Sequence, residues 1–431
     1  KTLNLTNTDF IRTTEHRHKK SVQSLWSELE KNNDIYLSKY SGWYSVSDEA
    51  FYNEDEVSDI DGKKISIASS STVEWVDEES YFFRLSKWEK PLLEFYEKNP
   101  DFISPKSRKN EVISFVKSGL KDLSISRKSF SWGIKVPNNN DHVIYVWLDA
   151  LTNYISALNY PNKNDQLFKK FWPSSIHLIG KDILRFHAVY WPAFLLAAKI
   201  DLPLKVYGHG WILSGDEKMS KSKGNILDPI EIINEYGLDP LRYYLIKEVS
   251  FGNDGNISQE RLEGCINSDL ANNFGNLCQR VVSFAIKNCE SKIPKEIKFQ
   301  KDDLKILDKY KSNLNIIRQK IDVQDINFYI DFIINSLFEA NKYFNDQEPW
   351  KKKDDLIRLN TIVYTTLEII RKVSFLLYPI IPESALKALK IFDIIENDID
   401  ISTIENNEFL VKDKKINEIK ILFKKVDKKN D

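Results

Sequence analysis

The sequence predicts an α/β protein in which a parallel sheet is interrupted by an inserted module and followed by an all-α bundle. Three observations lead to this prediction. Strand-like runs, polar turns and helical stretches alternate between residues 142 and 207, which is the order of a parallel sheet with crossover helices. An aromatic-rich region of short alternating segments precedes them. Amphipathic helices with apolar residues at steps of three and four fill the chain after about residue 262.

The composition excludes several classes of protein. A length of 431 residues indicates about three domains. The 62 Lys and Arg residues balance 63 Asp and Glu residues, so any contact with nucleic acid must come from local basic patches. The three cysteines (Cys265, Cys278 and Cys289) lack a paired short spacing, and we therefore expect neither disulfides nor a cysteine zinc site, but a reducing cytoplasm. No apolar run approaches about twenty residues, so no membrane span or signal peptide is expected.

Residues 15–31 are expected to form the first helix, which residues 1–14 connect to the start of the chain. Its apolar stripe consists of Val22, Leu25, Trp26 and Leu29. His16 and His18 fall on the polar side, where we expect them to be solvated. From about residue 32 to 118, short strand-like segments rich in aromatic residues indicate an inserted module.

Three strands are expected next, over residues 142–147, 175–179 and 204–207, each followed by a polar turn. In a parallel sheet, ligands bind beyond the carboxyl ends of the strands. The polar residues at these ends are Asp149, Lys181, Asp182 and His209. A carboxylate there could hold a substrate ammonium or ribose hydroxyls, although Asp149 could equally cap the helix that follows it. Lys181 is either a phosphate contact or a surface charge.

A side-chain pocket is expected beside these strand ends. Ile183 and His187 are four residues apart, so they share one face of the helix after the second strand. The six residues expected to line the pocket are Trp147, Ala150, Tyr154, Ile183, Phe186 and His187. Aromatic walls with an imidazole and a phenol as the polar tips suit a linear thioether side chain. The alternative is a histidine whose hydrogen bonds are satisfied within the core.

A lysine-rich loop, residues 208–225, follows the third strand. It is too polar for a core, and its ammonium and backbone N–H groups could bind a polyphosphate. The pentapeptide from Lys218 to Ser222, which includes Ser220 and Lys221, matches letter for letter the second signature of class I aminoacyl-tRNA synthetases. A solvated basic loop is the alternative.

The rest of the chain reads as helical. Asp228-Pro229 and Asp239-Pro240 are two helix-start signals. Long helices with regular apolar stripes then predict a bundle over residues 262–393. The residues after about Asp393 are rich in lysine, aspartate and asparagine and are expected to form a peripheral helix or a loose tail.

Two places in the bundle could contact RNA. Asn276 and Arg280 are four residues apart and point away from the apolar stripe, where an amide and a guanidinium could read base edges or phosphates. Trp350 is followed by three lysines, and an aromatic ring beside positive charge can stack on a base. The alternatives are a solvated face and a tryptophan packed under a loop.

The whole chain resembles the methionyl-tRNA synthetases of the bacterial type. The matching stretches, in the family's order, are Asp9–Thr14, Gly42–Ser47, Tyr145–Ala150, Ile179–Ile183, the lysine-rich loop, Asn276–Arg280 and Pro349–Trp350. The resemblance implies a Rossmann-type sheet that is incomplete at its N-terminus, because the family's first strand and its histidine signature are missing. It also implies a domain order. The expected segments are the remainder of the first Rossmann half (1–31), a connective insertion (32–118), the second Rossmann half (119–210), a lysine-loop and stem-contact region (211–261), an anticodon-binding domain (262–393) and a C-terminal extension (394–431).

The resemblance further implies a ligase that joins L-methionine to tRNA(Met) in two steps, with ATP and Mg²⁺. The six pocket residues would bind methionine. The residues that would bind ATP are Asp182, His209, Lys218, Ser220 and Lys221, and the two lysines would stabilise the departing pyrophosphate. Asn276, Arg280 and Trp350 would read the CAU anticodon.

Two departures from the family pattern qualify these expectations. Many relatives begin a zinc knuckle with Cys-x-x-Cys where this chain has Ser45 and Asp48, so we expect no structural zinc. The missing first signature leads us to expect little or no methionine-dependent pyrophosphate exchange from residues 1–431 alone. No dimerisation module is recognisable, and we expect a monomer.

Two alternatives stay open. Another class I synthetase is one, but leucyl, isoleucyl and valyl enzymes carry larger insertions and a cysteinyl enzyme needs thiolate zinc ligands. A tRNA-binding protein descended from a synthetase and impaired in catalysis is the other, and the intact lysine-rich loop argues against it.

Overall fold

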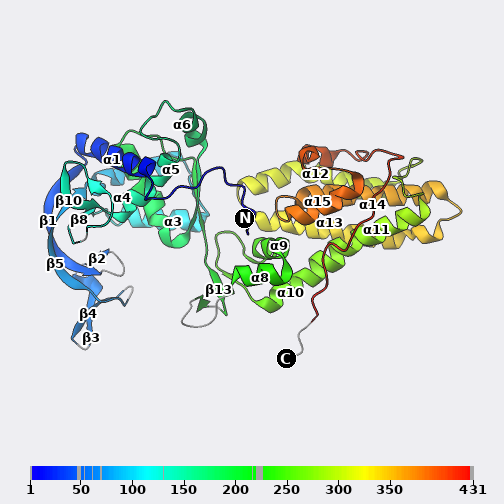
Figure 1. The fold of residues 1–431 in the computed structure, drawn as a ribbon, viewed down its shortest axis with the longest axis horizontal. Coiled ribbons are helices and arrows are strands. Elements are labelled where there is room, and N and C mark those ends of the chain that lie inside the picture. The colour runs from blue at the N-terminus through cyan, green and yellow to red at the C-terminus, as the bar shows by residue number, and fades with distance from the viewer. Residues whose placement is uncertain are drawn as a thin grey trace. The chain divides into compact units, whose positions relative to one another are not determined.

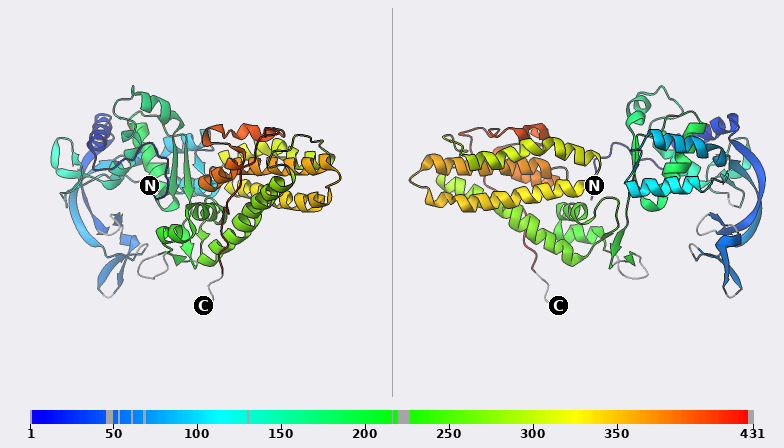
Figure 2. Two further views of the ribbon diagram at one scale, coloured as in Figure 1. Left: turned by 45° about the vertical axis from the view of Figure 1, so that its right-hand side comes forward. Right: turned by 180° about the vertical axis from the view of Figure 1, so that it is seen from behind.

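The computed structural model describes residues 2–45, 50–52, 54–60, 62–67, 70–129, 131–215, 217–219 and 227–427. The chain divides into two compact units (Figures 1 and 2). We call Leu5–His209 the α/β unit, and Gly210–Asp431 together with Lys1–Asn4 the helical unit. Each unit has its own apolar core.

The α/β unit begins with helix α1 (His16–Lys31), as predicted, and its stripe of Val22, Leu25, Trp26 and Leu29 is buried. A curved antiparallel sheet follows, in the order β2-β1-β5-β7. Its long central pair is β1 (Ile35–Ser45) and β5 (Glu74–Phe83), flanked by β2 (Ala50–Tyr52) and β7 (Leu123–Ser124). A separate hairpin is formed by β3 (Val57–Ile60) and β4 (Lys63–Ser66).

The expectation of strand-like segments as far as residue 118 is wrong beyond β5. Helices α2 (Glu89–Lys98) and α3 (Lys106–Lys117) occupy this stretch. Their buried residues, Leu92 and Tyr96 in α2 and Val112 and Val116 in α3, recur at steps of four, which is a helical period. Between the two helices, β6 (Ile103–Ser104) joins the parallel sheet.

The parallel sheet has the order β11-β12-β6. Strands β11 (Ile176–Gly180) and β12 (Lys205–His209) were both expected, and they pair in register from Ile176 opposite Lys205 to Gly180 opposite His209. The crossover between them passes through a short π-helical turn (Phe186–Tyr190) and α7 (Trp191–Ala197), which packs into the core.

The expectation that the first of the three strands joins the parallel sheet is wrong. β10 (Asn139–Ile144) pairs antiparallel with β8 (Ser126–Arg127) and β9 (Lys135–Val136) in a separate sheet. The chain then turns into α4 (Val146–Leu151) and α5 (Asn153–Ser156), so Trp147 lies on a helix. A buried apolar run does not reveal which strands it will pair with, because pairing is a long-range choice. Helix α6 (Gln166–Phe171) leads on to β11.

The helical unit opens with the small strands β13 (Ile212–Ser214), β14 (Glu217–Lys218) and β15 (Gly255–Asn256). Between them lie α8 (Pro229–Tyr236) and α9 (Leu238–Glu248). The Asp228 carboxylate accepts a hydrogen bond from the backbone N–H of Ile230 at 2.7 Å, which confirms the first predicted helix start. The second is wrong, because Asp239 lies inside α9 and instead accepts from the N–H of Ser384 in α15 at 2.6 Å.

A bundle of helices completes the unit (Figure 1). Its members are α10 (Gln259–Cys265), a π-helical segment (Ile266–Gly275), α11 (Asn276–Asn288), α12 (Lys301–Asp322), α13 (Ile326–Gln347), α14 (Leu356–Leu377) and α15 (Pro382–Leu389). Helix α14 is buried over most of its length and packs against α11, α12, α13 and α15. From residue 394 to 427, the chain is neither an α-helix nor a loose tail: it crosses the bundle as short 3-10 turns and extended chain, and buries Ile404, Leu410 and Ile416.

Candidate active site

Two aromatic rings form one wall of the expected side-chain pocket. The indole of Trp147 on α4 stacks on the phenyl ring of Phe186, with ring centroids 3.4 Å apart and ring planes 9° apart. Phe186 lies in the π-helical turn, and such turns reorient side chains that would point elsewhere from a regular α-helix. Ala150 lies on α4 and Ile183 ends the 3-10 turn Lys181–Ile183 that precedes Phe186, and both side chains are partly exposed.

A phenol and an imidazole supply the polar groups of this residue cluster. The Tyr154 hydroxyl lies 2.8 Å from Nε2 of His187, and Nδ1 of His187 lies 2.9 Å from the carbonyl oxygen of Ile183. A carbonyl oxygen only accepts, so Nδ1 carries the proton and Nε2 accepts from Tyr154. Burial lowers the pKa of His187 and raises the pKa of Tyr154 to about 12. Both groups are therefore neutral near pH 7.

A second histidine, which the sequence did not single out, supports this pair. His177 of β11 stacks on the Tyr154 ring at 3.9 Å, and its Nε2 accepts a hydrogen bond from the Trp191 indole at 3.2 Å. Burial, together with the nearby His187, lowers the pKa of His177 to about 3. The sequence did carry one signal: a polar residue between Ile176 and Leu178, which turn out to be the exposed side chains of the strand.

The expectation that His18 is solvated is wrong. Its imidazole is fully buried, with Nε2 2.6 Å from Oδ1 of Asp149 and Nδ1 3.0 Å from Oγ of Ser156. Asp149 does not cap a helix either, because it lies inside α4. The polar side of α1 is covered here by α4 and α5, and the neighbouring Arg17 takes the exposed ion pairs with Asp9 and Glu15. His16 is exposed, as expected.

The carboxyl ends of the parallel strands bring Asp182 and His209 together. Gly180 lies opposite His209 in the strand register, and both expected ligand residues are exposed. A Cβ atom added to Gly180 would lie 2.6 Å from Oδ1 of Asp182 and 3.9 Å from Cε1 of His209. The missing side chain of Gly180 therefore makes room for the Asp182 carboxylate at the strand edge.

The lysine-rich loop belongs to the helical unit. Lys218 lies in β14, opposite Leu213 of β13 in an antiparallel pair, and β13 also pairs with β15. Gly210 allows close packing at its base, since a Cβ there would lie 2.0 Å from the carbonyl oxygen of Asn253. Ser220 and Lys221 lie outside the described residues.

Arg280 and Trp350, expected to contact RNA, flank one phenyl ring of the bundle. The Arg280 guanidinium lies 5.1 Å from the Phe344 ring centroid, and Trp350 approaches that ring edge-on at 6.3 Å. Arg280 donates to the side-chain oxygen of Asn345 at 2.7 Å, which fixes its orientation. Trp350 is 42% exposed, and Asn276 is exposed at the start of α11. Arg280 and Trp350 thus both contact the ring of Phe344, and Asn276 lies on α11 together with Arg280.

Comparison with known proteins decides the family. The model of the class I tRNA synthetases (M) matches residues 1–63 and 59–282. The methionine–tRNA ligase of Brucella suis biovar 1 is 51% identical over 391 residues, which cover 90% of this chain and 76% of that protein. The chain belongs to the class I methionyl-tRNA synthetases. A methionine–tRNA ligase of Rickettsia conorii is 52% identical over the same share of both chains.

A solved structure agrees over nearly the whole length. The methionyl-tRNA synthetase of Mycobacterium tuberculosis, solved with methionyl-adenylate bound, superposes with a TM-score of 0.94 at 42% identity, covering 98% of this chain and 84% of that one. A methionyl-tRNA synthetase fold, with a parallel sheet and a helical C-terminal region, is thereby established for this chain.

The position of the family's zinc knuckle holds hydroxyl groups in this synthetase. Ser45 Oγ donates to Ser71 Oγ at 2.9 Å, while Asp48 lies outside the described residues. Within the described ranges, no three His, Cys, Asp or Glu side chains are grouped so as to hold a metal ion. A search of the same residues finds no helix with the length and apolarity needed to cross a membrane.

Proposed function

We propose that this chain performs the activation of methionine by ATP and the transfer of the methionyl group to tRNA(Met). The observation that carries the proposal is the aromatic cluster in which Trp147 stacks on Phe186 and Tyr154 donates to a neutral His187. It supports methionine as the amino acid because the thioether is apolar and polarisable, and sulfur gains from contact with aromatic rings. Membership of the family supports the same assignment.

The polar groups of the pocket favour an uncharged side chain. With His187 neutral and its Nδ1 proton committed to Ile183, neither His187 nor Tyr154 presents a charge to a bound side chain. An apolar pocket separates ligands that differ by one methylene by only about 1–3 kcal/mol. The Tyr154 and His187 contacts would therefore have to supply the rest of the discrimination, and Ala150 would leave the space that a long unbranched side chain needs.

For ATP we propose two groups of residues. Asp182 and His209 would contact the ribose or the amino acid at the strand ends, where Gly180 keeps the Asp182 carboxylate in place. Lys218, Ser220 and Lys221 would bind the phosphates, with the two lysines neutralising the charge of the departing pyrophosphate. Mg²⁺ would accompany the phosphates, since it prefers phosphate and carboxylate oxygens and keeps several waters. Phosphoryl-centre chemistry depends mainly on such positioning and charge neutralisation.

For tRNA we propose that Asn276, Arg280 and Trp350 read the anticodon. The support is an exposed amide, a guanidinium held by Asn345 and a half-exposed indole, which share one region of the bundle. The six segments expected from the family's domain order are kept as a proposal. We also propose a monomer that works in a reducing cytoplasm. Its three cysteines are unpaired and buried, and burial raises the pKa of the Cys265 and Cys289 thiols to about 11.

The test is methionine-dependent exchange of pyrophosphate into ATP, followed by methionylation of tRNA. The protein should exchange with methionine far better than with leucine or norleucine. A protein that binds tRNA but exchanges pyrophosphate with no amino acid would refute the proposal and favour a tRNA-binding protein. Exchange with a different amino acid would point to another class I synthetase.

A further inference from the structure

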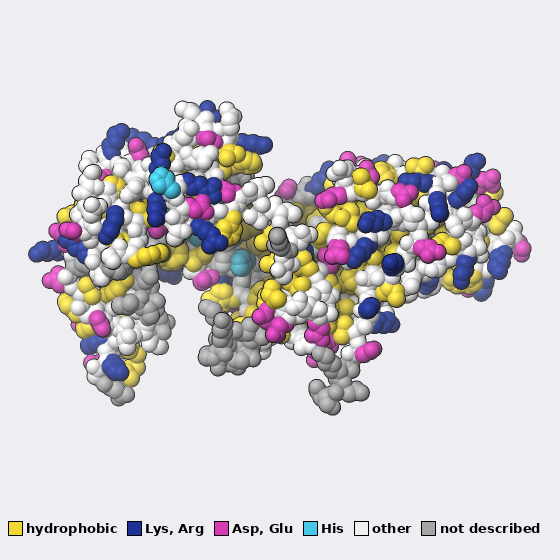
Figure 3. Space-filling model, in the orientation of Figure 1, with side chains coloured by type: hydrophobic (Ala, Val, Ile, Leu, Met, Phe, Trp, Pro, Cys, Tyr) yellow, Lys and Arg dark blue, Asp and Glu magenta, His cyan; other side chains and the backbone are white. Residues whose placement is uncertain are grey.

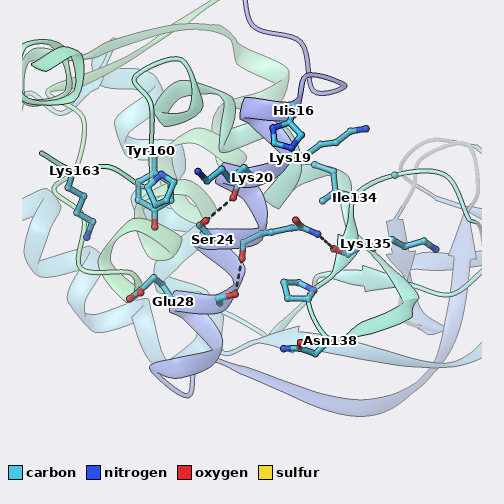
Figure 4. Close-up of a pocket in the computed structure, with 15 residues that line it drawn as sticks. His16, Lys19, Lys20, Ser24, Glu28, Ile134, Lys135, Asn138, Tyr160 and Lys163 are labelled. Carbon is cyan, nitrogen blue, oxygen red and sulfur yellow. Dashed lines mark hydrogen bonds between the residues drawn. The ribbon is translucent and has the colours of Figure 1, made fainter. Parts of the chain in front are cut away.

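A wide basic groove lies on the surface of the α/β unit, apart from the pocket described above (Figure 4). Its volume is about 1010 Å³. The exposed face of α1 forms one wall, and the loop and hairpin around β9 and the turn at residues 160–163 form the others. Gln23 on α1 donates to the carbonyl oxygen of Lys135 at 3.1 Å and joins two of these walls.

The side chains around the groove are mainly cationic. Lys19, Lys20, Lys135 and Lys163 line it together with His16, and Glu28 is the one carboxylate in the lining. Within the described part of the chain, none of the four lysines has a carboxylate oxygen within 4.0 Å. On the face of the bundle that Figure 3 shows, by contrast, Lys and Arg side chains are mixed with Asp and Glu side chains. The groove is therefore a local excess of positive charge in a chain whose net charge is only −1.

An exposed tryptophan adjoins this charge. Trp132 is 76% exposed and directly precedes Gly133, which lines the groove. Gly133 has a φ of 129°, and a Cβ atom there would lie 2.3 Å from Cγ1 of Val143. The loop is thus pressed against β10 at a position that only glycine can occupy, and this packing holds the loop that carries the indole ring. A largely exposed indole on a loop that also borders a basic groove is a combination suited to unstacked bases.

We propose that this groove binds the tRNA, with Lys19, Lys20 and Lys135 contacting backbone phosphates and Trp132 stacking on one unpaired base. The inference rests on the proposed function, because it assigns a second contact surface to the same partner. Lysines that face a groove without carboxylate partners match a phosphate backbone in charge. The indole adds affinity that does not depend on salt.

The lysine contacts are tested with the triple variant Lys19→Gln, Lys20→Gln, Lys135→Gln in the full-length protein. Binding of labelled tRNA(Met) is measured by fluorescence anisotropy at several salt concentrations. We expect affinity to fall about tenfold or more and the slope of log K against log salt to become less steep by about 2 to 3. The matched control is Lys98→Gln, Lys117→Gln, Lys121→Gln, three exposed lysines of the same unit that do not line the groove. The control should keep the wild-type slope.

The stacking contact is tested with Trp132→Ala and Trp132→Phe. We expect Trp132→Ala to lower tRNA affinity about fivefold to a hundredfold with an unchanged salt slope, and Trp132→Phe to restore most of it. Methionine binding should be unchanged in every variant, which shows that the fold is intact. If both the lysine variant and Trp132→Ala kept the wild-type affinity for tRNA and the wild-type salt slope, the groove would not bind tRNA, while the proposed function would stand. An acidic protein segment would then be the favoured occupant of the groove. A wild-type protein that binds no tRNA would overturn this inference and the proposed function together.

Discussion

The imidazole of His18 on α1 lies 2.6 Å from the carboxylate of Asp149 on α4, although the two residues are 131 positions apart in the chain. Asp149 lies two residues from Trp147, so this contact fixes the helix that carries the pocket's indole. His18 is also held by Ser156 of α5. One buried side chain therefore links α1 to both helices that supply Trp147, Ala150 and Tyr154.

The first prediction concerns this link. His18→Asn should lower the free energy of unfolding by about 2–4 kcal/mol, because it leaves the largely buried Asp149 carboxylate without its partner. It should also raise the dissociation constant for methionine. Urea denaturation and methionine titration measure the two effects. The matched control is His16→Asn, an exposed histidine on the same helix, which should change stability by less than about 0.5 kcal/mol. Equal stability of the two variants would show that the His18–Asp149 contact does not hold α4.

The second prediction concerns the Tyr154 hydroxyl. Tyr154→Phe leaves Nε2 of the buried His187 without its donor, so the KM for methionine should rise about tenfold, with a smaller change in kcat. Tyr190→Phe is the control, since Tyr190 lies in the same turn as Phe186 and its hydroxyl has no hydrogen bond among the described residues. Pyrophosphate exchange at varied methionine concentrations distinguishes them. A Tyr154→Phe enzyme with unchanged KM would mean that this hydrogen bond plays no part in methionine binding.

The third prediction concerns Gly180. Gly180→Ala would place Cβ 2.6 Å from Oδ1 of Asp182, and the side chain of Asp182 can move away at little cost in stability. We therefore expect a Tm within a few degrees of wild type but a KM for ATP raised about tenfold, as for loss of one charged contact. Gly264→Ala is the control, because an added Cβ there meets no atom within 4 Å. If Gly180→Ala bound ATP normally, Asp182 would not contact the nucleotide from this position.

The fourth prediction concerns pH and the C-terminal stretch. The Lys372 amine donates to the carbonyl oxygen of Ile404 and to the side chain of Asn407, both at 2.7 Å. Burial, assisted by the neighbouring Arg371, lowers the pKa of Lys372 to about 7, against 10.5 for an ordinary lysine. Between pH 7 and 10.5 the unfolded chain binds a proton at Lys372 that the folded chain does not. The contribution of Lys372 to the free energy of unfolding therefore rises with pH from about 7 upward.

This linkage is measurable by comparing variants. The unfolding free energy of the wild type should gain up to about 1.4 kcal/mol per pH unit from Lys372 between pH 7 and 8.5, and Lys372→Met should lose that gain. Lys387→Met, which changes an exposed lysine of α15 paired with Glu383, should keep the wild-type dependence. Parallel pH profiles for wild type and Lys372→Met would show that Lys372 is charged in the folded state.

Local patterns determined much of this protein. Apolar residues at steps of three and four specified α1, Asp228 specified the start of α8, and the spacing of four residues brings the His187 ring to the carbonyl oxygen of Ile183. These features depend on residues within one or two turns of each other. The strands β11 and β12 were also recognisable, because each is a short run rich in apolar residues that ends in a polar turn.

Only the tertiary structure decided which distant segments meet. It paired β10 antiparallel with β8 and β9, turned Trp147 onto a helix, buried His18 against Asp149 and stacked His177 on Tyr154. The partners in these contacts have no local signal, because a polar side chain is equally compatible with water and with a buried partner until the chain supplies that partner. The sequence by itself thus determined many of the elements and the chemistry of the expected pocket residues, and long-range packing decided how those residues are held.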